Sequence, residues 1–401
     1  MVFSTWVRIR QAGFWNIAAT AAWGLVLLAL VIRIACWQGR AGGFRTYEVA
    51  GLQWVRGEYL YGDWRGFVYG PLAAALFSPL AFLPPGVSHI LWTAVNFAAL
   101  VGGIGSIVGL YPNLERKNYG IPFLLLLPLA LGNLDIGQAN PLIIGLLMLA
   151  LGAVHRERWG IAALCVAFAT YFKIYPLAFG LLIAVIAPRR FGWRLLLALG
   201  LFGLMPFLLQ RWGYVFSQYQ GWFVTRLTDN RLNYPLKSAP LDLWLLLVRF
   251  GRLNISSRLY SALQVLSGAA IAVYCVVGSR RGWLRARVLI GLFSFVSIWM
   301  TLCGPATESQ TYLLLGPAVD LALVQAMVEP RPVWLRACVG CAFALLLLAV
   351  ARSMFAPGFK ELWVLAAQPV AAVIFLVYCL WWLLDDSQWP STASRRIANS
   401  E

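Results

Sequence analysis

The stretch AATAAWGLVLLALVIRIAC, Ala18–Cys36, is an almost unbroken apolar run and decides the class of fold. Similar runs recur at Ile121–Leu131 and Ala342–Ala351. With its flanking residues, each run supplies most or all of the roughly 20 residues that a helix needs to cross a bilayer. The runs do not alternate apolar and polar residues as the strands of a membrane β-barrel do. We therefore expect an all-α, polytopic transmembrane helical bundle. The run Trp15–Cys36 is too long for the core of a signal peptide and is predicted to be an uncleaved first anchor.

Composition and charge support this class. The chain has 401 residues, of which 61% are hydrophobic and 12% are charged, about half the charged fraction of a soluble domain. Its net charge of +17 comes from arginines spread over short segments between apolar runs, which is typical of membrane-flanking loops and not of nucleic-acid binding. When the basic segments are placed in the cytoplasm, about twelve crossings result, with both termini inside. We expect a single integral membrane domain, 1–401, in the cell (inner) membrane, with extracytoplasmic loops at about 37–86 and 211–257.

The first predicted outer loop is unusually polar. Its sequence from Gly42 to Pro85 is GGFRTYEVAGLQWVRGEYLYGDWRGFVYGPLAAALFSPLAFLPP. Long connections in compact proteins are often functional. The apolar part, Pro71–Leu83, is too short to span a bilayer, and we expect it to lie on the membrane or to re-enter it.

Three further segments fall on the same predicted face: the turn Asn133–Asn140, the corner Tyr171–Pro176 and the turn Cys303–Gln310. Together with the first loop they bring arginine, lysine and tyrosine, which suit a phosphate group. They also bring amides and aromatic rings, which suit sugar hydroxyls and sugar faces, and carboxylates able to accept a proton. This combination at a membrane face suggests chemistry on a lipid-linked sugar phosphate.

Each candidate also has a plainer interpretation. Glu48 is expected on a helix, where it could be an ordinary surface charge. Lys173 could extend its amine to the membrane surface, although a charge within an apolar run is also a functional candidate. Gln138 and Asn140 could cap the helix that begins near Pro141.

The sequence predicts no metal site and no cofactor. It contains no H-E-x-x-H and no phosphate-binding P-loop,. Cys338 and Cys341 form a lone CxxC inside a predicted spanning helix, where small packing residues are the better interpretation,.

Several motifs occur in the order found in a known family. In the first loop they are Tyr47, Ala50-Gly51, Gly57, Tyr61, Tyr69-Gly70-Pro71-Leu72 and Pro79-Leu80-Ala81. Later ones are Asn133 with Gly137-Gln138-Ala139-Asn140, Lys173-Ile174-Tyr175-Pro176, and Pro317 seven residues after Gln310. From about Trp15 to about Pro317 the chain resembles glycosyltransferase family 87, the polyprenol-phosphate-mannose-dependent mannosyltransferases of the GT-C type.

The chain departs from this family at two places. The family usually has an aspartate, its expected general base, just before the aromatic residue that opens the first loop; here that position is Gly43, followed by Phe44. The late motif commonly reads Trp-Glu-His-His, and the matching stretch here is Thr307-Glu308-Ser309-Gln310.

The resemblance implies that a sugar, such as the hexose mannose, moves from a polyprenyl-phosphate donor to an extracytoplasmic lipid or glycan acceptor. Glu48 or Glu308 is then expected to be the catalytic base. The expected donor-binding residues are Arg45, Tyr61, Arg65, Tyr69, Gln138, Asn140, Lys173 and Tyr175. Among them, Arg45, Arg65 and Lys173 would stabilise the phosphate. Expected partners are therefore the lipid donor, the acceptor and membrane lipid, and not nucleic acid.

Two alternatives remain at this stage. The first is a catalytically degenerate GT-C-like membrane protein that binds lipid-linked sugar, which the two departures favour. The second is a lipid or solute transporter, which should show charges along a path through the bilayer and repeated halves. Lys173 is the single such charge, and the sequence contains no recognisable repeat.

Overall fold

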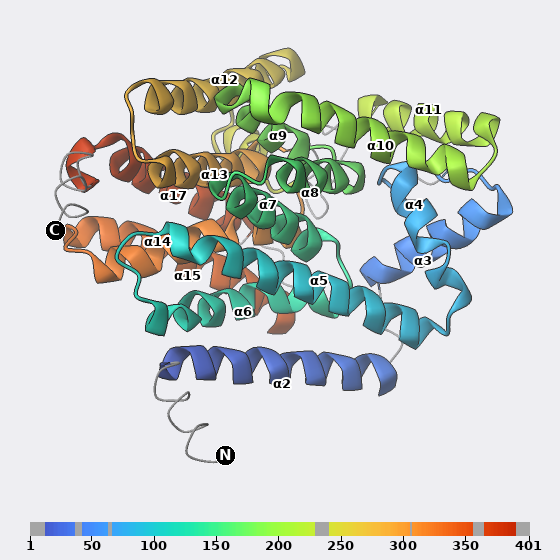
Figure 1. The fold of residues 1–401 in the computed structure, drawn as a ribbon, viewed down its shortest axis with the longest axis horizontal. Helices are drawn as coiled ribbons and strands as arrows, with labels where there is room; N and C mark the ends of the chain where they lie inside the picture. Colours follow the sequence, from blue (N-terminus) through green and yellow to red (C-terminus); the bar gives the residue numbers. More distant parts are fainter. Residues whose placement is uncertain are drawn as a thin grey trace.

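The computed structural model describes residues 13–36, 42–62, 66–228, 240–304, 307–355 and 365–389. These residues form α-helices joined by short turns and short 3₁₀ and π segments (Figure 1). In chain order the longer helices are α2 (Phe14–Cys36), α3 (Gly42–Arg56), α4 (Pro71–Phe77), α5 (Pro85–Ile107), α6 (Gly120–Asp135), α7 (Asn140–His155), α8 (Trp159–Phe172), α9 (Pro176–Ile186), α10 (Trp193–Leu209), α11 (Trp212–Thr228), α12 (Ser257–Arg280), α13 (Arg285–Leu302), α14 (Gly316–Val328), α15 (Val333–Phe355) and α17 (Ala367–Leu384).

Seven helical segments of the described chain are long and apolar enough to cross a membrane. Shorter apolar helices, such as α7, α8 and α9, pack among them. The predicted class, an all-α multi-pass membrane protein, is therefore confirmed. The number of about twelve crossings stays a prediction, because it depends on the shorter helices also spanning the bilayer.

Close backbone contact holds the centre of the bundle together. Two hydrogen bonds show that helices α5 and α7 run in the same direction. Leu142 donates its backbone N–H to the side chain of Asn96 (3.0 Å), and further along both helices the hydroxyl of Ser106 donates to the carbonyl of Met148 (2.9 Å). Gly145 lies between these contacts, and its missing side chain leaves room for the main chain of α5. Small residues allow such approach between membrane helices, where packing replaces the hydrophobic effect as the stabilising force.

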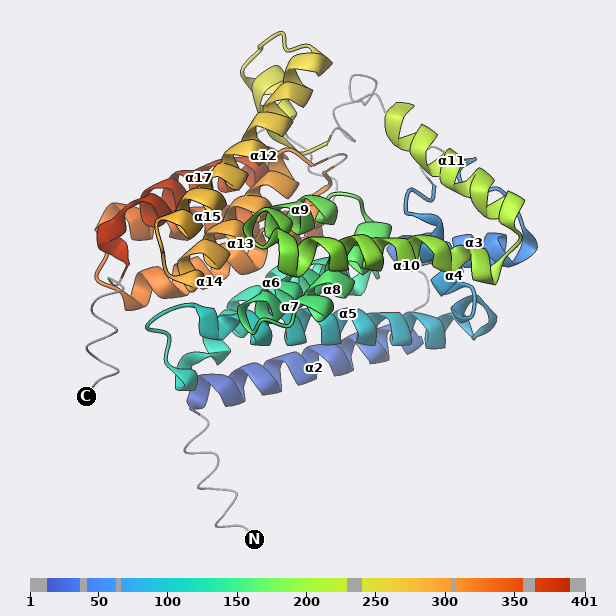
Figure 2. The ribbon, with the colours of Figure 1, turned by 45° about the horizontal axis from the view of Figure 1, so that its top comes forward.

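The bundle has two chemically distinct ends. Helix α7 runs from Asn140 to His155, α8 returns towards Lys173, and α9 runs back again. We call the end with Asn140 and Lys173 the Lys173 end, and the opposite end, with His155 and Arg285, the Arg285 end. Figure 2 shows α3, α4 and α11 gathered at one side of the bundle, next to one end of α5 and α10.

The segment expected to be a long polar loop is largely helical. Its residues form α3, α4 and the short 3₁₀ segment η2 (Leu80–Phe82). Glycine at position 51 allows α3 to approach α4, because a Cβ there would lie 2.7 Å from the carbonyl oxygen of Phe77. Most of α4 is buried against protein. The alanine-rich α4 therefore fits between neighbouring helices and does not lie flat on the outside of the bundle. Re-entry of Pro71–Leu83 into the membrane stays a prediction.

Helix α11 covers the remainder of this region. The hydroxyl of Tyr214 donates to the carbonyl of Glu58 (2.8 Å), and the side chain of Gln218 accepts from the backbone of Leu60 (2.9 Å). The opposite side of α11 exposes Trp212 and Phe216. The helix is thus amphipathic, with one side bonded to residues 42–85, which we call the first-loop segment.

Candidate functional site

A chain of polar side chains at the Lys173 end links three helices. Lys173 lies in the corner between α8 and α9, and its Nζ donates to Oδ1 of Asn140 at 2.8 Å. The side-chain amide of Asn140 in turn donates to Oδ1 of Asn133 at 2.9 Å. Asn140 is only 1% exposed. The amine of Lys173 is therefore held in a fixed, half-buried position by a buried amide.

These bonds also decide between two interpretations of Asn140. If Asn140 capped α7, its side chain would accept a bond from a backbone N–H of the first turn. Instead Ala139 occupies the N-cap position, without a side-chain bond. The capping interpretation is wrong for both Gln138 and Asn140, because their side chains point to other partners.

Tyrosines of the first-loop segment meet the same turn. The hydroxyl of Tyr69 lies 3.5 Å from Oε1 of Gln138, and the ring of Tyr47 packs against Tyr69 at 4.7 Å between centroids. The hydroxyl of Tyr61 donates to the carbonyl of Tyr69 (2.8 Å), which fixes the backbone there. The next residue, Gly70, donates its N–H to the carbonyl of Tyr171 (3.1 Å). The first-loop segment is thus attached to both the α6–α7 turn and the α8–α9 corner.

Glu308 reaches this region from the far part of the chain. It precedes the 3₁₀ segment η9 (Ser309–Leu314), and its carboxylate accepts from the backbone N–H of Thr311 in a capping box. The backbone of Leu241 donates to the carbonyl of Thr307 (2.7 Å) and anchors the turn from the side. Glu308 itself is exposed. A carboxylate is therefore presented on a rigid turn and remains open to an approaching group.

Tyr175 connects the two halves of this arrangement. It follows Lys173 in the corner outside α8 and α9, and the Lys173 amine lies 5.6 Å from its ring centroid. Burial raises the pKa of the Tyr175 hydroxyl well above its ordinary value, and neighbouring Tyr69 and Glu308 raise it further. The hydroxyl is buried. Tyr175 thus lies within electrostatic range of both Tyr69 and Glu308 and keeps its proton at neutral pH.

The structure gathers six of the predicted site residues into what we call the polar cluster: Tyr69, Gln138, Asn140, Lys173, Tyr175 and Glu308. It combines one cation, one carboxylate, two amides and two phenols. Such a set can bind a phosphate, hydrogen-bond a sugar and accept a proton. Among the described residues, no group of three or more His, Cys, Asp or Glu side chains is placed to hold a metal ion.

Other predicted residues stand apart from the cluster. Glu48 is half-buried on α3, and its side chain forms no hydrogen bond or ion pair with any residue that the structure describes. Arg45 is exposed on the same helix, and the hydroxyl of Tyr61 is engaged by backbone. Arg65 lies outside the described residues.

Two residues that support the polar cluster were not among the predicted site residues. Tyr47 packs on Tyr69, and Asn133 orients Asn140. The sequence contained a usable signal for Asn133, because it lies one helical turn before the Gly137–Asn140 motif and at the end of an apolar run.

The position of the absent aspartate is occupied by neighbouring atoms. A Cβ at Gly43 would lie 2.7 Å from the carbonyl oxygen of Ile136 and 3.3 Å from Cγ of Gln138. The backbone of Phe44 also donates to that carbonyl, at 3.0 Å. The start of α3 therefore packs directly on the α6–α7 turn, and Gln138 lies where a side chain at position 43 would begin.

A multi-helix membrane protein with a polar cluster at one end of its bundle is the class that fold and site define. Within that class, the chain belongs to glycosyltransferase family 87, whose model matches residues 67–305. The match includes every cluster residue except Glu308.

Two individual proteins are also similar. A "polyprenol-phosphate-mannose-dependent alpha-(1-2)-phosphatidylinositol pentamannoside mannosyltransferase" of Mycobacterium tuberculosis (strain CDC 1551 / Oshkosh) is 32% identical over 118 residues, which are 27% of this chain and 26% of the relative. The matched region therefore spans only about a quarter of that relative. Among solved structures, ArnT from Cupriavidus metallidurans bound to undecaprenyl phosphate is 14% identical with a TM-score of 0.39, over 91% of this chain and 76% of ArnT.

Proposed function

We propose that the protein transfers a sugar, such as mannose, from a polyprenyl-phosphate donor to an acceptor hydroxyl outside the cell membrane. The observation that carries this proposal is the hydrogen bond between Lys173 and Asn140, which fixes a cation at one end of the bundle beside the phenol ring of Tyr175. Membership of family 87 supports sugar transfer. The name of the mycobacterial relative supports a polyprenol-phosphate-mannose donor.

Lys173 is proposed to bind the phosphate of the donor. When the bond between the anomeric carbon and the phosphate oxygen breaks, the departing lipid phosphate gains negative charge. A fixed ammonium stabilises this charge more in the transition state than in the ground state, because it need not reorganise during the reaction. Tyr175 and Tyr69 would add hydroxyl donors, and the lipid chain would lie along neighbouring apolar helices.

Glu308 is proposed to be the general base. As the acceptor oxygen forms its bond to the anomeric carbon, its proton passes to the carboxylate of Glu308. Glu308 fits this role better than Glu48 because it is exposed and lies within electrostatic range of Tyr175. The side chain of Glu48 forms no hydrogen bond or ion pair with the cluster in the described part of the chain. The acceptor is proposed to be a lipid or glycan hydroxyl.

The Lys173 end is proposed to face away from the cytoplasm. The short connections of the opposite end each carry a pair of exposed basic residues: Arg116 and Lys117, Arg156 and Arg158, Arg189 and Arg190, and Arg280 and Arg281. Short basic connections are retained in the cytoplasm during insertion. The cell (inner) membrane is the proposed location.

One observation favours a second function, the binding of lipid-linked sugar without catalysis. At Gly43 the chain lacks the family's expected base, and the packing of α3 on Ile136 and Gln138 leaves no room for a side chain there. In this alternative Lys173 would still bind phosphate, but no carboxylate would accept the acceptor proton.

The carboxylate substitutions Glu308→Gln and Glu48→Gln separate these possibilities. Glutamine retains an acceptor for the Thr311 backbone N–H, so the η9 cap should survive. Purified variants in liposomes are given a radiolabelled polyprenyl-phosphate sugar and a membrane lipid extract as acceptor, and transfer of label is measured. Loss of a general base lowers the rate by a factor of about 10²–10⁴. We therefore expect the transfer rate of Glu308→Gln to fall by that factor and the transfer rate of Glu48→Gln to stay within about threefold of wild type.

The result has distinct meanings. Full transfer by Glu308→Gln would eliminate Glu308 as the base. Wild-type protein that binds the donor but transfers nothing would favour the non-catalytic function. Wild-type protein that fails to bind the donor would overturn both.

A further inference from the structure

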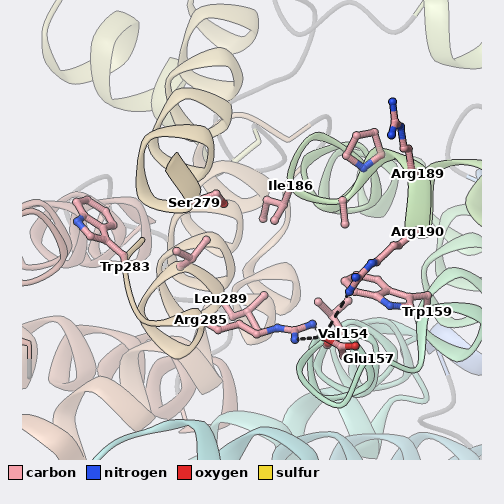
Figure 3. A pocket seen from close by; sticks show the side chains of 13 residues that line it. Val154, Glu157, Trp159, Ile186, Arg189, Arg190, Ser279, Trp283, Arg285 and Leu289 are labelled. Carbon is pink, nitrogen blue, oxygen red and sulfur yellow. Dashed lines mark hydrogen bonds and ion pairs between the residues drawn. The ribbon is translucent and has the colours of Figure 1, made fainter. Parts of the chain in front are cut away.

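A cavity of about 470 Å³ lies at the Arg285 end, far from the polar cluster (Figure 3). It lies between the α7–α8 and α9–α10 connections on one side and helices α12 and α13 on the other. Helices α7, α8 and α9 contribute to it with the ends opposite to those that carry Asn140, Lys173 and Tyr175. A helix of the length of α7 separates its two ends by about 24 Å at 1.5 Å per residue. One ligand group therefore cannot occupy both places.

The charged lining of this cavity is positive. It contains the guanidinium groups of Arg189, Arg190 and Arg285 and one carboxylate, Glu157. Arg285 donates to Glu157 (2.7 Å) and to the carbonyl of Val154 (2.6 Å), and Arg190 lies 3.5 Å from the same carboxylate. The hydrogen bond from Arg285 holds the pKa of Glu157 below its ordinary value, so the carboxylate stays ionised. One negative charge thus faces three positive charges.

Arg189 is the unbalanced member of this group. It is exposed and forms no ion pair with any residue that the structure describes. In Figure 3 its side chain points away from the other two arginines, while Arg190 is directed towards Glu157. Because an exposed arginine changes rotamer readily, Arg189 can turn towards an anion that enters beside Arg190.

The remaining walls of the cavity are mostly apolar, and the helices that lead to it are apolar on their exposed surface. Trp159, Ile186, Trp283 and Leu289 line it. The two helices that lead to the cavity, α9 and α12, expose large apolar side chains along their length, Leu181 and Val185 on α9 and Leu266 and Val273 on α12. An apolar exterior next to a basic recess suits a molecule with acyl chains and an anionic headgroup. A soluble anion would use only the arginines.

We propose that this cavity binds the phosphate headgroup of an anionic phospholipid. The phosphate contacts Arg189 and Arg190, and the acyl chains lie against α9 and α12. Basic pockets between membrane helices bind anionic lipid headgroups through such charge-assisted hydrogen bonds. The site is independent of the sugar-transfer site, since it uses no residue of the polar cluster.

Native mass spectrometry of the full-length protein tests this site. Protein in neutral detergent is titrated with phosphatidylglycerol or, as the uncharged comparison, with phosphatidylcholine. The variant Arg189→Ala/Arg190→Ala removes two exposed charges from the cavity. The matched variant Arg280→Ala/Arg281→Ala removes two exposed charges from the same end outside the cavity lining.

Wild type should prefer phosphatidylglycerol to phosphatidylcholine. The variant Arg189→Ala/Arg190→Ala should bind phosphatidylglycerol about thirtyfold more weakly than wild type, because each arginine near a membrane surface contributes about 1 kcal/mol to lipid binding. Arg280→Ala/Arg281→Ala should bind it as wild type does. Equal losses in the two double variants would overturn the proposal in favour of a diffuse surface charge. Lack of preference between the two lipids, or displacement of the lipid by millimolar inorganic phosphate, would also overturn it.

Discussion

The substitution Lys173→Met tests the central feature of the polar cluster. Methionine retains most of the length and apolar surface of the lysine stem but removes the ammonium. In the structure that ammonium is half-buried and bonded at 2.8 Å to Asn140, which also bonds Asn133. We expect the variant to bind polyprenyl phosphate more weakly while binding of the uncharged polyprenol of the same length is unchanged.

The size of the effect follows from the fixed position of the amine. A hydrogen bond to a charged group contributes about 1.5–3 kcal/mol. At about 1.4 kcal/mol for each tenfold change in Kd, this corresponds to about 10- to 150-fold weaker binding of polyprenyl phosphate. Loss of the bond to Asn140 also leaves a buried amide oxygen without its donor, which we expect to lower the stability of the protein by about 1–3 kcal/mol.

The assay follows quenching of intrinsic tryptophan fluorescence in detergent-solubilised protein during titration with each lipid. Two variants serve as controls. Lys173→Arg keeps the positive charge and should retain most of the binding. Arg56→Met removes an exposed charge from the same end, where Arg56 lies 3.8 Å from Glu58 in a solvent-exposed pair, and should bind as wild type does.

Three results would refute the reasoning about Lys173. The first is wild-type affinity of Lys173→Met for polyprenyl phosphate. The second is an equal loss of affinity for the uncharged polyprenol, which would show that packing and not charge had been altered. The third is an equal loss in Arg56→Met, which would indicate general electrostatic attraction.

Further predictions concern packing and the base. Gly43→Ala should lower the stability of the protein by about 1–3 kcal/mol relative to Gly42→Ala, because a Cβ at position 43 meets a carbonyl oxygen at 2.7 Å whereas position 42 is open. The two variants are compared by their apparent melting temperatures in detergent. Equal melting temperatures would contradict the close packing at Gly43. Gly145→Ala should lower the stability of the protein by about 2–3 kcal/mol relative to Gly102→Ala, since position 145 faces the main chain of α5 and position 102 faces open space. Equal melting temperatures of these two variants would contradict the close approach of α5 and α7. Glu308→Gln should leave the melting temperature within a few degrees of wild type while transfer falls, and unfolding of this variant would instead assign Glu308 a structural role.

The helical bundle could be predicted well from the sequence because lipid imposes one strong rule. Backbone groups in a bilayer must bond within their own segment, so long apolar runs become helices. The runs Ala18–Cys36 and Ala342–Ala351 accordingly lie within α2 and α15. The family resemblance was confirmed over residues 67–305, a region that includes the motifs around Gln138 and Lys173. The predicted motifs before Phe67 and after position 305 lie outside that match.

The first-loop segment was predicted less well. Its charges and tyrosines indicated a polar loop, but α3 buries Phe44, Tyr47 and Trp54 against protein. The sequence could not reveal this, because the partner surface is formed by the distant α6–α7 turn and by α4. Likewise helix capping stayed open as an alternative for Gln138 and Asn140, since capping is a local interaction and their actual partners, Tyr69 and Lys173, are distant in the chain.

The sequence by itself determined that this chain is a multi-pass helical membrane protein with polar motifs between its apolar runs, because hydrophobic length and charge act locally. Only the tertiary structure decided which motifs meet. It brought Lys173 into a hydrogen bond with Asn140 and Glu308 within electrostatic range of Tyr175, and it left the side chain of Glu48 without a partner among the described residues. The physical reason is that such contacts depend on helix packing and on a few small residues, such as Gly43 and Gly145, that let backbones approach,.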